Sequence, residues 1–196
     1  TEAEAQLFRQ AAPEVAGRVG VMQNGVDADY FSPDHTFDSP FPPGGPVLLF
    51  TGAMDYWPNI DAVVWFAGEL LPKVRQQFPD ARFWIVGMNP APAVQALAAE
   101  GVVVTGTVPD VRPYLAHADV VVTPLRIARG IQNKVLEAMA MAKPVIVSPC
   151  AAKGIDSVPG AQLPVADGPE AEARAVCELA GNPNRARKIG AAARAQ

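Results

Sequence analysis

Short apolar runs alternate with segments of helical periodicity from residue 47 to the end of the chain. The apolar runs show almost no alternation of apolar and polar residues, which is typical of strands buried on both faces of a parallel sheet. Five of them are expected to be strands: Val47–Thr51, Arg82–Val86, Val102–Thr105, Val120–Thr123 and Pro144–Ser148. A weaker sixth strand is expected at Gln162–Val165.

The segments between these strands predict helices, because their apolar residues recur every three or four positions. In the longest segment, Val63, Phe66, Leu70 and Val74 share one face, and Asn59 is expected to cap its start. The predicted helices are Ile60–Phe78, Ala91–Glu100, Val111–Ala118, Lys134–Ala142, Glu170–Leu179 and Arg185–Ala195. Strands and helices that alternate over short loops form right-handed crossovers. The sequence therefore predicts an α/β fold with a Rossmann-like, doubly wound parallel sheet.

The first 46 residues lack this regular alternation. Residues 1–18 indicate the end of a helix, Arg18–Gln23 a short strand, and Asn24-Gly25 a turn. Residues 27–46 are rich in proline, glycine, aspartate and serine, which excludes long regular elements and indicates a linker.

We expect the chain to be a piece of a longer protein, because it begins with Thr1 and not with methionine. It is divided into the tail of a preceding domain or an interdomain helix (1–18), an entering strand with a linker (19–46), and the main domain (47–196). The fraction of hydrophobic residues, 49%, is high enough for the main domain to build a sizeable core.

Charge and cysteine content exclude several classes of function. A net charge of −4 gives no general attraction to nucleic acid, so no nucleic-acid partner is expected. Cys150 and Cys177 form no disulfide or zinc pattern and are expected to be core residues in a reducing compartment. No cluster of histidine, cysteine and acidic residues has metal-ligand spacing, and no apolar run is long enough to span a membrane.

A ligand of such a sheet is expected outside the carboxyl ends of the strands. Gly52, Gly87 and Gly106 each follow a strand directly, where a glycine either permits a tight turn or lets the backbone approach a ligand. Before the helix at Lys134–Ala142, the cations Arg126 and Arg129 precede Lys134 with no acid between them. Arginines in a loop are often solvated, but a helix N-terminus favours anions, so we favour a phosphate contact for Arg129 and Lys134.

Glu137 lies early in the same predicted helix, among apolar residues. A buried carboxylate needs a partner, and two remain open. Lys134, three residues earlier, shares a helix face with Glu137 and could pair with it. Alternatively, Glu137 accepts hydrogen bonds from two neighbouring hydroxyl groups of a ligand, as an acid does with a ribose in dinucleotide-binding folds.

Four segments of the chain, taken together, resemble one enzyme family. The run Lys134-x-x-Glu137-Ala138-Met139-Ala140-x-x-Lys143-Pro144-Val145-Ile146 resembles the donor-site signature of group 1, or family 4, retaining glycosyltransferases of GT-B fold. Three further segments are similar to family segments in the same order: Asn24-Gly25-Val26-Asp27-x-x-x-Phe31-Ser32-Pro33, Thr105–Leu115 and Ala118–Leu125. The spelling Gly130-Ile131-Gln132-Asn133-Lys134 is most similar to sugar transferases of bacterial exopolysaccharide and PEP-CTERM systems.

The resemblance implies a donor-binding site and two departures from the family pattern. The implied donor-binding residues are Gly52, Val108, Arg129, Gly130, Ile131, Gln132, Lys134 and Glu137. Among them, Glu137 matches the family's ribose-clamping acid, and Val108 matches a loop that lies against the nucleobase. Arg129 stands where the family's first acid is expected, and the usual arginine and lysine that contact pyrophosphate after Gly52 are absent. Arg129 and Lys134 are expected to supply that missing positive charge.

The resemblance therefore implies the C-terminal, nucleotide-sugar-binding half of a hexosyltransferase, with a nucleoside diphosphate sugar as substrate and no metal or other cofactor. Its acceptor-binding N-terminal domain would be missing, so the fragment alone is expected to be inactive and its catalytic residues are not identified. The full enzyme would be cytoplasmic, free or attached to the inner membrane surface. Alternatives are half of a GT-B sugar-nucleotide epimerase, a non-catalytic binding module and a dinucleotide-dependent oxidoreductase. The oxidoreductase is disfavoured because no Gly-x-Gly-x-x-Gly fingerprint follows any strand.

Overall fold

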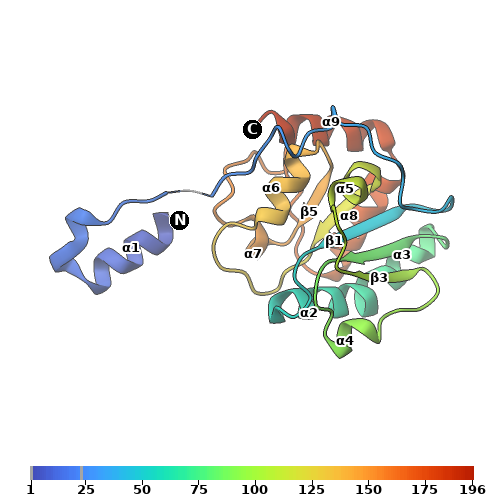
Figure 1. Cartoon of the computed structure of the whole chain (residues 1–196), viewed down its shortest axis with the longest axis horizontal. Coiled ribbons are helices and arrows are strands. Elements are labelled where there is room, and N and C mark those ends of the chain that lie inside the picture. The colour runs from blue at the N-terminus through green and yellow to red at the C-terminus, as the bar shows by residue number, and fades with distance from the viewer. Residues whose placement is uncertain (1, 23) are drawn as a thin grey trace.

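Five parallel strands form one sheet in the computed structural model, which describes residues 2–22 and 24–196 except for the side chain of residue 3. The strand order is β3-β2-β1-β4-β5 (Figure 1). The strands are β1 (Val47–Thr51), β2 (Arg82–Val86), β3 (Val102–Gly106), β4 (Val120–Thr123) and β5 (Val145–Val147). All five predicted strands are confirmed, with ends that differ by one residue at most.

The strands of the sheet are apolar because both faces are covered. Every residue of the central strands β1 and β4 is buried, whereas the edge strand β3 is mostly half-buried. Successive side chains of a strand point to opposite faces. In β2, Phe83 accordingly packs against Phe66 with ring centroids 4.4 Å apart, while Trp84 packs against Phe41 at 4.9 Å on the other face.

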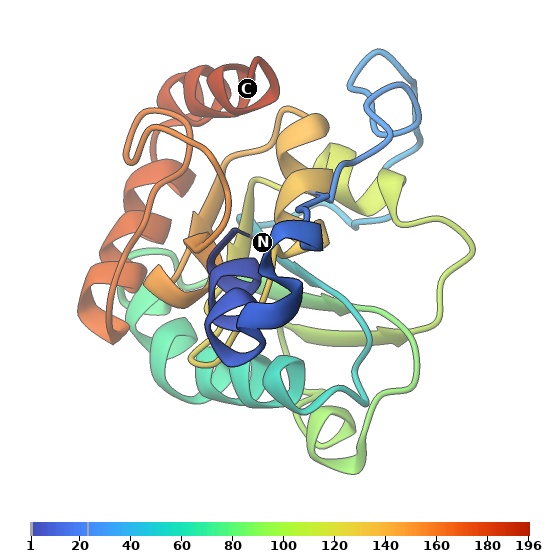
Figure 2. The same ribbon diagram turned by 90° about the vertical axis from the view of Figure 1, so that its left-hand side faces the viewer.

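Helices cover both faces of the sheet. Those after the linker are α2 (Trp57–Trp65), the π-helix η2 (Phe66–Leu70), α3 (Leu71–Gln77), α4 (Pro92–Gln95), α5 (Arg112–His117), α6 (Asn133–Ala140), α7 (Pro149–Ala152), α8 (Pro169–Ala180) and α9 (Pro183–Arg194). Helix α8 packs against α3 and η2, whereas α5 is joined to the turn after α6 by a hydrogen bond from Lys143 to the carbonyl of Ala116. Helix α9 contacts both α6 and α8 near the end of the chain (Figure 2).

Several predicted elements are shorter than expected. The helix predicted at Ala91–Glu100 is reduced to α4, because Ala99 bridges Val102 in the turn before β3. The strand predicted at Gln162–Val165 is reduced to a single bridge between Val165 and Val147, which still supplies hydrogen bonds to the edge of β5. The helix predicted at Lys134–Ala142 ends at Ala140, and Ala142 takes a φ of 53° beyond its end.

The short strand predicted at Arg18–Gln23 is wrong for the residues described. Arg18 ends the 3₁₀ helix η1 (Pro13–Arg18), residues 19–22 are irregular, and Gln23 lies outside the described residues. A strand needs a neighbouring strand for its backbone groups, and the Val19 carbonyl instead accepts a hydrogen bond from Arg9. The domain boundaries at 1–18, 19–46 and 47–196 stay predictions.

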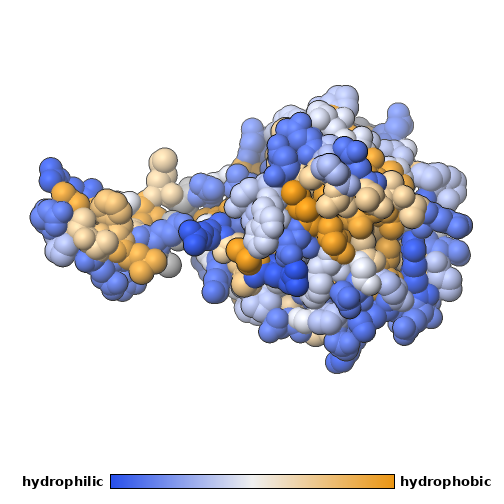
Figure 3. Space-filling model, turned by 90° about the horizontal axis from the view of Figure 1, so that it is seen from below, coloured by the Kyte–Doolittle hydropathy of each residue, from blue (hydrophilic) through white to orange (hydrophobic). Residues whose placement is uncertain are grey.

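The N-terminal helix α1 (Glu2–Ala11) confirms the helical character expected for the first residues, but it projects from the sheet domain (Figure 3). Leu7 and Phe8 are 67% and 56% exposed on this projecting segment. Among the described residues no helix has both the length and the apolarity needed to cross a membrane. Cys150 and Cys177, both expected in the core, are free thiols that are only partly buried, and Cys177 packs against the core.

Glu172 of α8 is a buried acid whose side chain is only 3% exposed. Burial, and secondarily the charge of Asp167, raises the pKa of Glu172 from 4.5 to about 8. The folded chain therefore holds this proton more tightly than the unfolded chain does. The free energy of unfolding should consequently fall as the pH rises from 4.5 towards 8.

We expect Glu172→Gln to raise the free energy of unfolding by about 1–2 kcal/mol at about pH 9 and to change it little at about pH 4. The gain is limited because the amide remains a buried polar group. Urea unfolding at the two pH values measures the difference, with the exposed Glu69→Gln as the control. A Glu172→Gln chain with the same pH dependence as the wild type would contradict the assignment.

Candidate functional site

A cavity of about 570 Å³ opens at the carboxyl ends of β1, β2 and β3, beside the start of α6. This is where the strand order reverses, because β1 continues to β2 and β3 on one side and has β4 on the other. Its walls come from the turns after the three strands, from α6 and from the linker. The lining segments are Tyr30–Phe31, Thr51–Ala53, Asn59, Val86–Met88, Thr107–Val111, Ile131 and three residues of α6, namely Asn133, Lys134 and Glu137.

The turns after β1 and β2 pack backbone against backbone at the floor of this cavity. A Cβ atom built on Gly87 would lie 1.6 Å from the carbonyl oxygen of Gly52. A Cβ atom built on Gly52 would lie 2.8 Å from Asn59 Nδ2 and 2.9 Å from Lys134 Nζ. Close backbone approach therefore requires a glycine at Gly87, and the absence of a side chain at Gly52 lets the Lys134 amine reach the end of β1.

Lys134 extends from the first turn of α6 to this turn. Its Nζ lies 2.5 Å from Asn59 Oδ1 and 4.2 Å from the centroid of the Phe50 ring. The Asn59 amide is oriented by its own donation to the Ala53 carbonyl at 2.9 Å. Burial lowers the pKa of Lys134 from 10.5 to about 7, although the nearby Glu137 carboxylate acts in the opposite direction. The cavity thus holds an amine whose protonated form a bound anion would stabilise.

The Glu137 carboxylate faces the cavity one helical turn after Lys134. Burial raises the pKa of Glu137, and the charge of Lys134 partly offsets that rise. Within residues 2–22 and 24–196 no hydrogen-bond donor reaches this carboxylate, and Lys134 and Glu137 make no direct ion pair. The oxygens of Glu137 are therefore available to hydroxyl groups of a ligand.

Thr51 adds a second unpaired polar group. Its side chain is 4% exposed at the end of β1, and its hydroxyl has no hydrogen-bond partner among the described residues. Buried hydroxyls are normally paired, so a ligand in the cavity could satisfy this one. In the sequence Thr51 is a threonine at the end of an otherwise apolar strand. Threonine is common in strands, so the sequence pattern alone did not mark it as a site residue.

Five of the eight predicted donor-binding residues line the cavity: Gly52, Val108, Ile131, Lys134 and Glu137. Gly130 and Gln132 lie beside it, in the turn before α6, where Gln132 Nε2 donates to the Arg129 and Gly130 carbonyls at 3.2 and 3.3 Å. Arg129 is exposed and does not line the cavity, so its phosphate contact stays a prediction.

Arg126 is directed away from the cavity. Its guanidinium pairs with Asp61 of α2 and lies 5.6 Å from the Trp65 ring centroid. The expectation that Asn59 caps α2 is wrong, because α2 begins at Trp57 and Tyr56 occupies the capping position. Pro58 in the first turn fixes this earlier start, which frees the Asn59 side chain to hold Lys134.

A second cavity, of about 370 Å³, lies on the other side of α6 against the end of α9. Its lining includes Leu136 and Met139 and one cation, Arg194. Both terminal nitrogens of the Arg194 guanidinium donate within the chain itself, including to the carbonyls of Phe31 and Ala140. This cavity therefore has fewer polar groups available to a ligand than the cavity at the carboxyl ends of the strands.

Comparison with known families identifies the group to which the chain belongs. A family model described as "Glycosyl transferases group 1" matches residues 45–182, which is more than half of the chain and includes Lys134 and Glu137. The chain belongs to the group 1 glycosyltransferases. No curated protein matches this glycosyltransferase chain significantly.

Several solved glycosyltransferases share the fold. A glycosyltransferase from Rickettsia africae superposes with a TM-score of 0.74 at 20% identity, covering 92% of this chain and 52% of that one. Anabaena HepE, solved in complex with UDP, gives a TM-score of 0.73 at 17% identity, and the match covers 100% of this chain and 56% of HepE. Sucrose-phosphate synthase from Thermosynechococcus elongatus gives a TM-score of 0.68 at 18% identity, and the match covers 98% of this chain and 51% of the synthase.

These comparisons confirm the predicted fold class. The five-stranded parallel sheet with helices on both faces is the Rossmann-like α/β fold of GT-B glycosyltransferases. This glycosyltransferase chain spans about half the length of the solved structures that it matches. Identities this low bear on the fold alone, so the chemistry must be argued from the cavity itself.

Proposed function

We propose that the cavity binds a nucleoside diphosphate sugar, and that the chain is the donor-binding half of a retaining hexosyltransferase acting on a glycan or lipid-linked acceptor. The observation that carries this proposal is the pair formed by Lys134 and Glu137 in one cavity. The buried amine lies at the turn after β1, and the carboxylate without a hydrogen-bond donor lies one helical turn away. Anabaena HepE, which shares the fold, was solved with UDP-glucose.

The roles of the two residues follow from their surroundings. The Lys134 amine would contact the diphosphate, and its protonation would stabilise the charge that develops on the departing nucleoside diphosphate. The Glu137 carboxylate would accept hydrogen bonds from the ribose hydroxyls. Transfer of this kind depends on positioning and on stabilisation of the leaving group, so we propose a reaction without a metal cofactor. Among the described residues no group of three potential histidine, cysteine or acidic ligands is close enough to hold a metal ion.

The remaining parts of the proposal concern the whole enzyme. An N-terminal domain would supply the acceptor wall and the catalytic residues that act on the sugar, so the chain by itself would transfer little. The resemblance of Gly130–Lys134 to bacterial exopolysaccharide transferases supports a role in polysaccharide synthesis at the cytoplasmic side of the inner membrane.

The proposed ribose contact predicts that Glu137→Gln lowers the affinity for UDP about tenfold or more, because the amide is neutral and offers one acceptor oxygen in place of two. Affinity for 2′,3′-dideoxy-UDP should already be low and should change little in the variant. Calorimetric titration of both nucleotides against both chains measures this coupling. UDP, GDP and ADP titrated side by side identify the base.

The control is Glu69→Gln, an exposed glutamate of η2 outside the cavity. A wild-type chain that binds none of the three nucleoside diphosphates at millimolar concentration would remove the donor-site proposal. Equal losses for UDP and its dideoxy analogue in Glu137→Gln would leave a donor site but remove the ribose contact.

A further inference from the structure

Tyr30 is a linker residue that lines the donor cavity. It lines the cavity together with the turn that contains Val108, and it remains 45% exposed. Sequence reasoning did not select it, because nothing in the local pattern places the linker against the carboxyl ends of the strands. An aromatic side chain this exposed, in a cavity that already holds a cation and an acid, requires an explanation.

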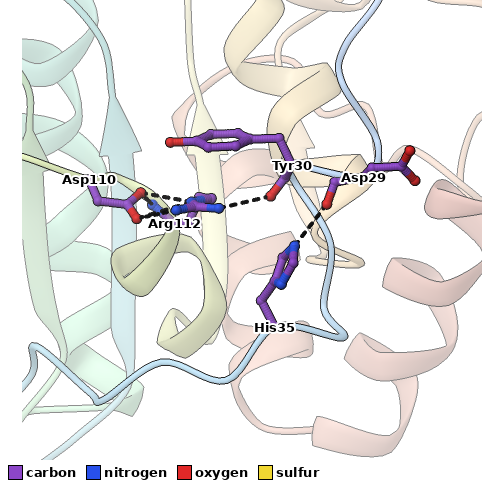
Figure 4. A network of polar contacts seen from close by, with 5 residues as sticks. All are labelled: Asp29, Tyr30, His35, Asp110 and Arg112. Carbon is purple, nitrogen blue, oxygen red and sulfur yellow. Dashed lines mark hydrogen bonds and ion pairs between the residues drawn. The ribbon is translucent and has the colours of Figure 1, made fainter.

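One face of the Tyr30 ring is covered by the chain itself. The Arg112 guanidinium carbon lies 3.8 Å from the ring centroid, so the guanidinium is stacked on the ring (Figure 4). Arg112 does not line the cavity, whereas Tyr30 does. Arg112 thus occupies one face of the ring, and the exposure of Tyr30 leaves other ring surface available to a ligand.

The stack is held from both sides. Asp110 accepts from Arg112 Nε at 3.0 Å and from Nη2 at 2.7 Å, which fixes the plane of the guanidinium (Figure 4). Arg112 Nη1 also donates to the Tyr30 carbonyl at 3.3 Å, and the Tyr30 backbone N–H donates to Asp27 Oδ1 at 2.9 Å. Phe31 meets the edge of the ring, with centroids 5.0 Å apart.

The linker around the stack is fixed as well. His35 Nε2 lies 2.8 Å from the Asp29 carbonyl, which closes the turn that carries Tyr30 (Figure 4). An aromatic ring whose position is set before binding loses little conformational freedom when a ligand packs against it. Ion pairing with Asp110 neutralises the Arg112 charge beside the cavity, so Arg112 is suited to supporting the ring more than to attracting phosphate.

We infer that Tyr30 is the surface on which the nucleobase of the donor stacks, with Arg112 as the positioning residue behind it; this rests on the proposed function. The assignment follows from the order of groups along the cavity. In the proposed binding mode, Lys134 lies at the diphosphate end of the cavity and Glu137 lies beside the ribose. Tyr30 shares the remaining wall with the turn after β3, which contributes the apolar Val108 and Val111 together with Asp110, an acid already paired with Arg112. Stacking accepts any base, so Tyr30 contributes affinity, and discrimination between bases must come from other groups.

Tyr30→Leu tests the inference, because leucine fills part of the volume but has no aromatic face. We expect it to weaken UDP binding about tenfold or more and to leave the binding of inorganic pyrophosphate unchanged. Tyr30→Phe, which keeps the ring, should bind UDP within about twofold of the wild type. The uracil H5 and H6 protons should shift upfield on binding to the wild type and to Tyr30→Phe, and not on binding to Tyr30→Leu.

The matched control is Tyr56→Leu, a tyrosine that is 58% exposed and does not line the cavity. If Tyr30→Leu lowers the melting temperature but binds UDP as the wild type does, Tyr30 only fastens the linker and the inference is overturned. Equal losses for UDP and pyrophosphate also overturn it. Failure of the proposed function looks different, because the wild type itself would then bind no nucleoside diphosphate.

Discussion

Lys134→Met is expected to lower the affinity of the chain for UDP-glucose about a hundredfold at about pH 6.5, the largest loss of any single cavity substitution. Methionine keeps the length and the packing of the side chain against Phe50 but removes the charge. Charge-assisted hydrogen bonds to a diphosphate are each worth about 1.5–3 kcal/mol, and tenfold in affinity corresponds to about 1.4 kcal/mol. Calorimetric titration of the variant and the wild type measures the difference.

The pH dependence of the same binding provides an independent check. In the free chain, burial lowers the pKa of Lys134 to about 7, so the amine is largely neutral above that pH. A bound diphosphate stabilises the charged amine, and binding must then take up a proton. Affinity of the wild type should therefore fall by up to about tenfold per pH unit above about pH 7. UDP-glucose is the suitable ligand because its diphosphate does not titrate near neutral pH.

In Lys134→Met this slope should vanish, and calorimetry in buffers of different ionisation enthalpy should detect proton uptake only for the wild type. The matched control is Arg129→Met, the other cation expected from the sequence, which is exposed outside the cavity. If the affinity of Lys134→Met still falls with pH, or if Arg129→Met loses more affinity for UDP-glucose than Lys134→Met does, the pyrophosphate contact belongs to another group.

Gly87→Ala is expected to prevent stable folding, at a cost of more than about 4 kcal/mol. The new Cβ atom would lie 1.6 Å from the Gly52 carbonyl oxygen, and both atoms belong to rigid turns at the ends of paired strands. Neither turn can retreat without breaking hydrogen bonds such as that from the Gly52 N–H to the Val86 carbonyl. Circular dichroism and urea unfolding measure the outcome.

Two glycines provide matched controls for this substitution. Gly68 lies in η2 with nothing within 4 Å of an added Cβ, so Gly68→Ala should be neutral or stabilising by up to about 1 kcal/mol. Gly106 also has open space but a φ of +70°, so Gly106→Ala should cost about 1–2 kcal/mol through backbone strain alone. A Gly87→Ala chain as stable as Gly106→Ala would mean that the two turns do not pack as described.

The candidate site divides into residues that local sequence could identify and residues that it could not. Lys134 and Glu137 stand out within one short helix, because charged residues on an apolar segment need partners wherever the helix is placed. Arg129 looked equivalent to Lys134 along the chain, but the turn before α6 leaves it exposed. Which of two neighbouring cations enters the cavity depends on the direction of the backbone at the start of the helix.

Local sequence pattern was sufficient to predict the five strands, most of the helices between them and hence the parallel doubly wound sheet. Apolar runs and helical periodicity show which residues are buried. A strand that is apolar throughout therefore predicts a sheet covered on both faces, without knowledge of distant contacts. Three contacts are visible only in the folded chain: Asn59 accepts a hydrogen bond from Lys134, the turns at Gly52 and Gly87 pack together, and Tyr30 of the linker lines the cavity. These contacts join residues far apart in the chain, and they exist because the strand order brings the turns after β1, β2 and β3 together with α6.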